Sequence, residues 1–179
     1  MLGVHNATRV YGPDLTLAVL EQAARSGIAI GLFGASKEVA DLFAKRMSER
    51  FEGLRIVYNY SPPFRHLTTE EDAQIVNDIV RSGARIVLVG LGNPKQERWM
   101  ALHKGSVAAV MVGVGAAFDF LAGTKPQAPR WLMQAGLEWL FRLATEPRRL
   151  WKRYLKHNPR FVALLILQLL GFRPIKNTI

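Results

Sequence analysis

The stretch RIVLVGLGNPKQERWMALHKG, residues 85–105, decides the fold class of this chain. It opens with a predicted strand over 85–92, in which Arg85 is followed by a continuous apolar run typical of a strand buried on both faces. A helix is predicted to follow, with Asn93 as its N-cap, Pro94 at its first helical position and Gly105 at its end. A buried strand that leads directly into a helix is the repeating unit of a parallel α/β sheet.

The same alternation extends to either side of this stretch. Further strands are predicted at residues 28–33, 54–60 and 107–115, and helices at roughly 13–26, 36–50 and 68–83. The helix signals are specific, because Ser36 can cap the second helix and Gly83 can end the third. We therefore predict an α/β protein whose residues 1–124 form a Rossmann-like parallel sheet with helices on both faces.

Residues 125–179 differ from this body in both structure and charge. Residues 128–146 predict one helix, and Pro147 and Pro159 are each predicted to begin another. The body carries 13 Lys and Arg against 12 acidic residues, whereas the tail carries 11 against only Glu138 and Glu146. The formal net charge of +10 is therefore concentrated in a basic helical appendage, which would attract anionic partners.

The anionic partner of the appendage stays open at this point. Nucleic acid, a membrane surface and a polyanionic small molecule all fit basic helices that carry Trp and Tyr, and the charges could also be a solvated helix face. The apolar run 161–172 argues against nucleic acid. At about 1.5 Å per residue it is too short to span a bilayer. It could lie in a membrane interface or pack as a buried helix.

Several classes of chemistry are excluded or weakened by composition. The chain has no cysteine, so disulfides, thiolate metal sites and cysteine nucleophiles are excluded, and a reducing cytoplasm is compatible with this. Its four histidines are scattered, and no spacing indicates a metal site. Neither the dinucleotide fingerprint G-x-G-x-x-G nor the Walker pattern is present, which disfavours a nicotinamide dehydrogenase.

Glycines mark the predicted corners between strands and helices, where ligands of parallel sheets bind. Gly34, Gly92, Gly113 and Gly115 are candidate binding positions, because glycine lets a phosphate or sugar approach the backbone. The alternative is that these glycines only form tight turns.

Polar side chains next to these corners could carry chemistry. Lys95 and Gln96 offer a cation and an amide to a sugar or phosphate, whereas Glu97 is interpreted as a capping residue. Asp119, between two phenylalanines, could be catalytic or could cap the turn that follows it.

Three motifs together show a resemblance to a known family. RVYGPDL at 9–15, GLGNPKQERWM at 90–100 and the long motif from Gly113 to Phe161 resemble the WecG/TagA/CpsF family of bacterial glycosyltransferases. The match runs in order from about Arg9 to about Phe161, and the C-terminal motif is highly specific.

The resemblance implies a function. Members transfer a sugar, typically N-acetylmannosamine, from a UDP-sugar to a polyprenyl-pyrophosphate-linked N-acetylglucosamine, and some transfer other hexoses. The family is regarded as inverting, metal-independent and free of cofactors, and it works at the cytoplasmic face of the membrane on a Rossmann-like core. The implied partners are the UDP-sugar donor, the polyprenyl-linked acceptor and an anionic membrane surface, with no nucleic acid; monomer or homo-oligomer stays open.

The resemblance also carries residue roles onto this sequence. Arg9 and Gln96 match residues of the family's substrate pocket. Arg142, Arg149 and Arg153 match the appendage that supplies cations to the diphosphate, a task that planar guanidinium groups suit. That match gives the basic appendage two expected uses, at the diphosphate groups and at the anionic lipid surface.

One departure from the family concerns the base. Members carry an Asp-Gly motif before the arginine that matches Arg9, and its Asp is the general base that takes the acceptor proton. That motif has no counterpart here, and neither Asp14 nor Asp119 occupies its position. We expect the chain to be a fragment; the alternatives are a base from a partner, or a module that binds membranes without catalysing.

Overall fold

A computed structural model describes residues 10–169 of the chain. Within the last helix, six side chains lie outside the description: those of Arg149, Lys152, Arg153, Lys156, His157 and Leu169. The chain divides into two compact units between Lys125 and Pro126. Each unit is described by itself.

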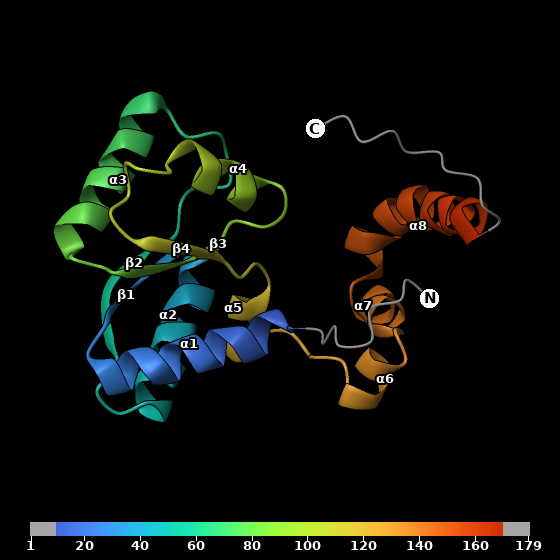
Figure 1. Ribbon diagram of the computed structural model, residues 1–179, viewed down its shortest axis with the longest axis horizontal. Coiled ribbons are helices and arrows are strands. Elements are labelled where there is room, and N and C mark those ends of the chain that lie inside the picture. The colour runs from blue at the N-terminus through green and yellow to red at the C-terminus, as the bar shows by residue number, and fades with distance from the viewer. Residues whose placement is uncertain (1–9, 170–179) are drawn as a thin grey trace. The chain divides into compact units, whose positions relative to one another are not determined.

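The first unit is built on a four-stranded sheet in which every neighbouring pair of strands is parallel. The strand order is β2-β1-β3-β4, and helices cover both faces (Figure 1). The strands are β1 Ala29–Gly34, β2 Arg55–Tyr60, β3 Ile86–Gly90 and β4 Val110–Gly113; the helices are α1 Gly12–Ser26, α2 Lys37–Arg50, α3 Thr69–Ser82, α4 Lys95–Leu102 and α5 Ala117–Leu121. The predicted α/β class with a parallel sheet is confirmed, and the arrangement is consistent with a Rossmann-like fold.

Each face of the sheet has its own hydrophobic core, because successive side chains of a strand point to opposite faces. On one face, Leu32 and Leu88 pack with α1, α2 and α5, with Phe43 and Phe118 fully buried there. On the other face, Phe33 of β1 packs with Val87 and Val89 of β3 and with side chains of α3 and α4. The two central strands are therefore buried on both sides, as their continuous apolar sequences predict.

Helix ends in this unit follow local sequence signals. The Ser36 hydroxyl accepts a hydrogen bond from the backbone N–H of Val39, 3.4 Å away, at the start of α2. Thr68 and Glu71 form a reciprocal capping box at the start of α3. Gly83, in the left-handed region with a φ of 71°, ends α3 as predicted.

In this unit, α4 and β4 differ most from their predicted bounds. Helix α4 begins at Lys95 with Pro94 itself as the N-cap, so the predictions of Asn93 as the cap and Pro94 at the first helical position were wrong. It ends at Leu102, before Gly105. Strand β4 covers only 110–113 of the predicted 107–115, because it pairs with β3 alone and that pairing ends at Gly113.

The second unit is helical, as predicted, but its helices divide differently. Its helices are α6 Arg130–Gln134, α7 Glu138–Thr145 and α8 Pro147–Leu169. The predicted single helix over 128–146 is interrupted at Gly136, whose φ of 72° is left-handed. Pro147 begins α8 as predicted, but Pro159 lies inside α8 and begins no new helix, so that prediction was wrong.

Helix α8 is amphipathic without being a membrane span. Within residues 10–169, no helix combines the length and apolar character that crossing a bilayer requires. Several of its large apolar side chains are nevertheless exposed, with Leu155 at 68% and Phe161 at 66%, whereas Leu150 is buried.

Candidate functional site

The sheet has a topological switch point between its two central strands. β1 and β3 are neighbours, while β2 and β4 lie on opposite outer sides of them. Ligands of open parallel sheets bind outside the carboxyl ends of the strands at such a point. Here those ends meet closely: the Ala35 N–H donates to the Gly90 oxygen over 3.0 Å, and a Cβ on Gly34 would lie 2.5 Å from the Gly90 carbonyl carbon. Gly34 is therefore required by the approach of two backbones.

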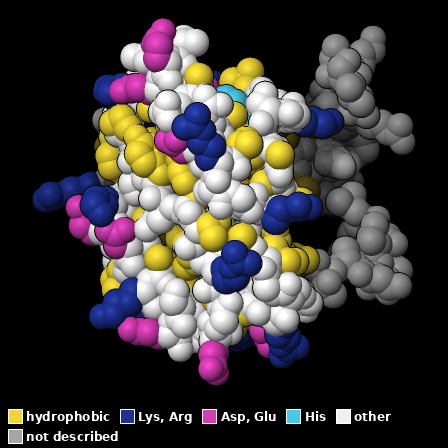
Figure 2. Space-filling model, turned by 90° about the vertical axis from the view of Figure 1, so that its left-hand side faces the viewer, with side chains coloured by type: hydrophobic (Ala, Val, Ile, Leu, Met, Phe, Trp, Pro, Cys, Tyr) yellow, Lys and Arg dark blue, Asp and Glu magenta, His cyan; other side chains and the backbone are white. Residues whose placement is uncertain are grey.

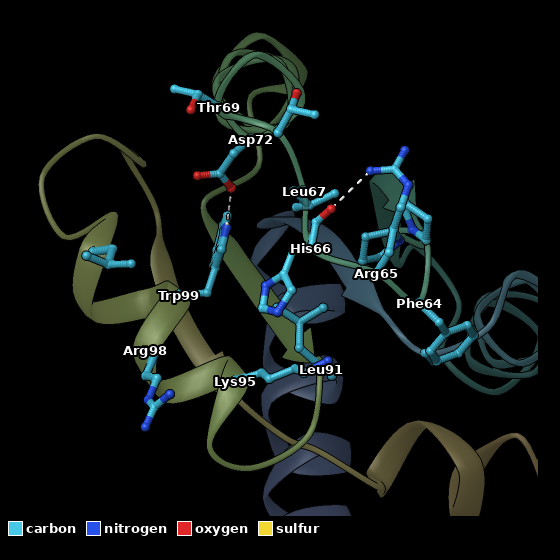
Figure 3. Close-up of a pocket in the computed structure, with 16 residues that line it drawn as sticks. Phe64, Arg65, His66, Leu67, Thr69, Asp72, Leu91, Lys95, Arg98 and Trp99 are labelled. Carbon is cyan, nitrogen blue, oxygen red and sulfur yellow. Dashed lines mark hydrogen bonds between the residues drawn. The ribbon is translucent and has the colours of Figure 1, made fainter.

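A pocket of about 470 Å³ opens at this end of the sheet. Its walls are Ala35 after β1, residues 62–69 from the β2–α3 connection to the first residue of α3, Asp72 of α3, Gly90 at the end of β3 with Leu91 after it, and side chains of α4 (Figure 3). Its volume is in the range of sites for small organic ligands. The sequence did not predict that 62–69 forms a wall; Pro62-Pro63 indicated only that the strand stops there.

A polar network joins α3 and α4 at this pocket, whose lining includes Asp72 and Trp99. The Trp99 indole N–H of α4 donates to Asp72 Oδ1 of α3 over 2.8 Å, and His103 Nε2 lies 2.9 Å from Asp72 Oδ2. The Trp99 and His103 rings stack with their centroids 4.5 Å apart. Both carboxylate oxygens of Asp72 are therefore engaged within the protein.

Cations flank the pocket with different partners. Arg65 makes a bidentate pair with Glu71, both N···O distances being 2.6 Å, which ties the 62–69 segment to α3. Lys95 and Arg98 line the pocket from α4, and within the described part of the chain neither makes an ion pair. Lys95 extends toward Leu91 in Figure 3. These two positive charges are available to an anion.

Gln96 occupies a second corner, between the ends of β3 and β4. Its side chain is only 7% exposed, and its Oε1 is buried with no hydrogen-bond partner in the described structure. A Cβ added to Gly113 would lie 2.9 Å from Gln96 Nε2, and one added to Gly115 would lie 3.6 Å from Oε1. The two glycines therefore make room for this amide, so the structure brings Gln96, Gly113 and Gly115 together.

Glu97 lies in the first turn of α4, where a carboxylate stabilises the helix N-terminus. Its own backbone N–H, and then the amides of Gln96 and Asn93, lower the pKa of its carboxyl, while desolvation opposes them. Gln96 Nε2 donates to Glu97 Oε1 over 2.9 Å. The interpretation of Glu97 as a capping residue agrees with this geometry.

Asp119 lies on the short helix α5. Its carboxylate is 3.2 Å from the Lys125 ammonium group, and its backbone oxygen accepts from the Thr124 hydroxyl at 3.1 Å. Both contacts organise the turn after α5, which is the structural role left open by the sequence. Its side chain remains about one quarter exposed.

Of the remaining predicted site residues, the structure describes Gly92 and Arg142. Gly92 lies in the turn before α4 with a φ of 79°. Arg142, in α7 of the second unit, pairs with Glu138 at 2.7 Å. Arg9 and the side chains of Arg149 and Arg153 lie outside the described residues. Within residues 10–169, no group of three or more His, Asp and Glu side chains could hold a metal ion.

The fold and this site define a parallel α/β protein with a ligand pocket and a buried amide at the carboxyl ends of its strands. The chain belongs to the glycosyl transferase WecG/TagA/CpsF family, which residues 1–174 match.

Two curated relatives have the same name, N-acetylglucosaminyldiphosphoundecaprenol N-acetyl-β-D-mannosaminyltransferase. The one from Bacillus spizizenii is 29% identical over 167 residues, which cover 93% of this chain and 62% of the relative. The one from Bacillus subtilis is 30% identical over 149 residues, covering 83% of this chain and 56% of the relative. The chain thus spans about three fifths of the length of these relatives.

Proposed function

We propose that the chain is part of an inverting glycosyltransferase that moves N-acetylmannosamine or a related hexose from a UDP-sugar to a polyprenyl-diphosphate-linked saccharide. Membership of the family and the names of the two relatives support this reaction type and acceptor. The product would enter cell-surface polysaccharide or teichoic acid synthesis. The activity is that of the whole protein to which these residues belong.

The observation that carries the proposal is the buried amide of Gln96. An amide oxygen without a partner in a buried site is costly, and a ligand N–H or O–H would satisfy it. Sugars and their N-acetyl groups supply such donors. Gly113 and Gly115 leave the room that the Gln96 side chain occupies, which holds its amide at this corner.

The reaction assigns a task to each kind of residue. The acceptor hydroxyl oxygen forms a bond to the anomeric carbon of the donor sugar, the bond from that carbon to the UDP oxygen breaks, and the hydroxyl proton passes to a base. The leaving diphosphate gains negative charge, which Arg142, Arg149 and Arg153 would offset. Asp119 is the base candidate within these residues, and its pairing with Lys125 would have to break for it to act.

Replacement of Gln96 by alanine tests this assignment. We expect Gln96→Ala to weaken UDP-sugar binding at least about fivefold, since a hydrogen bond to a buried group is worth roughly 1 kcal/mol or more. Isothermal titration calorimetry measures it. The matched control is Gln74→Ala on the exposed side of α3, which should bind as the unmodified chain does. Equal affinity in all three proteins would remove Gln96 from the site.

A second candidate is a module that binds membranes without catalysing. It is favoured by α8, where Trp151, Leu155, Val162 and Ile166 share one helix face and are each at least 47% exposed. A peripheral location on the inner face of the plasma membrane is proposed on the same observation, for the enzyme as well as for the module.

Vesicle sedimentation tests membrane binding. Leu155→Ser with Ile166→Ser should release the protein from vesicles of anionic lipid, because the apolar face is lost while the basic charge stays. Exposed Val80 on α3 provides the control substitution Val80→Ser. If the double variant sediments as strongly as the control, α8 does not bind through this face.

A further inference from the structure

The pocket bounded by residues 62–69 has no assigned ligand in the proposed reaction, which uses the neighbouring Gln96 corner. Its lining includes the aliphatic side chains of Pro62, Pro63, Leu67 and Leu91, beside the aromatic rings of Phe64 and Trp99. Nucleobase sites combine apolar contact with polar groups that read the base edge. Two of the polar groups in this pocket already have partners within the protein. The Thr68 hydroxyl accepts a hydrogen bond from the Glu71 N–H, and the two Asp72 carboxylate oxygens contact Trp99 and His103.

The rim of the pocket is apolar and exposed. Phe64 is 91% exposed and Leu102 is 79% exposed, on opposite walls of the same pocket. Figure 3 shows Phe64 on the segment that follows β2. Large apolar side chains that rim a cavity mark a site for an apolar ligand rather than a solvated surface.

Positive charge stands beside this apolar lining. Lys95 and Arg98 reach the pocket without an ion pair among the described residues. Asp72 is the one carboxylate among the lining residues that the structure describes, and its Trp99 and His103 partners reduce its repulsion of an anion. This combination suits an organic diphosphate, with cations for the diphosphate and apolar side chains for an aliphatic part.

We propose that this pocket binds the prenyl diphosphate end of the acceptor, an assignment that rests on the proposed function for the acceptor's identity. The isoprene units next to the diphosphate lie against Leu67 and Leu102, and Phe64 covers them. Lys95 and Arg98 bind the diphosphate. Because Lys95 precedes Gln96 in the first turn of α4, a saccharide on that diphosphate extends toward the Gln96 corner.

Binding without turnover tests the proposal. Calorimetry with farnesyl diphosphate, below its critical micelle concentration, is compared with inorganic pyrophosphate and with UDP. We expect farnesyl diphosphate to bind at least about tenfold more tightly than pyrophosphate, because only its prenyl chain gains apolar burial. Phe64→Ser and Leu102→Gln should each weaken farnesyl diphosphate binding about fivefold and leave pyrophosphate binding unchanged. Lys95→Ala should weaken both.

Three control variants isolate the pocket. Val80→Gln changes an exposed apolar residue of α3, Leu155→Gln tests prenyl binding to α8, and Arg85→Ala removes a cation at the opposite end of β3. None of them should change the affinity for farnesyl diphosphate.

Three results would overturn the proposal. The first is farnesyl diphosphate binding no more tightly than pyrophosphate. The second is Phe64→Ser and Leu102→Gln behaving as Val80→Gln does. The third is these two variants losing UDP but keeping farnesyl diphosphate, which would make the pocket a nucleoside site. Pocket-dependent farnesyl diphosphate binding in a protein that transfers no sugar would count against the proposed function alone.

Discussion

At the scale of single residues, the carboxyl end of the sheet depends on glycines that leave room for particular neighbours. A Cβ on Gly90 would collide with the Phe118 ring, coming within 2.6 Å of its Cε2 atom. Phe118 is fully buried and packs on Phe43 with ring centroids 4.7 Å apart, so it cannot move aside. One missing methyl group therefore permits the packing of Phe118 in the core at this end of the sheet.

Gly90→Ala should lower the free energy of unfolding by about 1–3 kcal/mol, the range for overpacking a well-filled core. Urea denaturation followed by circular dichroism measures the loss. Gly12→Ala is the control, because its Cβ would meet only the Val114 oxygen at 3.8 Å. Equal stability of the two variants would show that Phe118 is not held as tightly as the structure has it.

At the scale of elements, the 62–69 segment is held to α3 by one ion pair that also completes a helix cap. The Glu71 carboxylate accepts hydrogen bonds from both terminal guanidinium nitrogens of Arg65 and from the backbone N–H of Thr68. The hydrogen bond from Arg65 and then that from Thr68 lower the pKa of Glu71 to about 2, from an ordinary value of 4.5. The 62–69 wall of the pocket is therefore held to α3 through the Glu71 carboxylate.

This pair has a defined pH signature. Because the pKa of Glu71 is lowered on folding, its stabilising effect is complete above the unfolded-state value near 4.5 and is lost as the pH falls toward 2. Glu71→Gln should remove that part of the pH dependence, so that its unfolding free energy falls less steeply than the parent's between these values. Urea titrations at several pH values measure the slopes, with Glu49→Gln on α2 as control. Parallel slopes for the parent and Glu71→Gln would contradict the ion pair.

Sequence patterns predicted the elements that obey local rules. The continuous apolar strands, the cap at Ser36 and the glycine after α3 all follow from short-range chemistry, and the structure confirms them. The patterns failed where context decides. The sequence alone does not show that Gly136 adopts a left-handed φ, which interrupts the predicted helix. Pro159 was predicted to begin a helix, but α8 continues through it.

The candidate site divides in the same way. Gln96 and the glycines were recognisable as corner residues, because they directly follow buried strands. The sequence did not show that Lys95 and Gln96 belong to two neighbouring sites, because that depends on the direction in which each side chain leaves α4. The network of Asp72, Trp99 and His103 joins two helices, and nothing in the spacing of these residues indicates it.

At the scale of the whole molecule, charge and apolar surface are distributed unequally between the two units. The body is nearly neutral, and Figure 2 shows Lys and Arg interspersed with Asp and Glu over the face it presents. The basic excess and the exposed apolar helix face both belong to the second unit. This division suits an enzyme whose body binds the reacting groups and whose appendage binds anionic partners.

The most direct test of this account is sugar transfer by the protein expressed from its complete reading frame. UDP release is measured from UDP-N-acetylmannosamine with a short-chain prenyl-diphosphate-linked N-acetylglucosamine, for the parent and for Gln96→Ala, with Gln74→Ala as control. We predict acceptor-dependent UDP release in the parent and the control, and a loss of at least about tenfold in Gln96→Ala. Acceptor-dependent release that is equal in all three proteins, or no release from any UDP-hexose, would contradict the account.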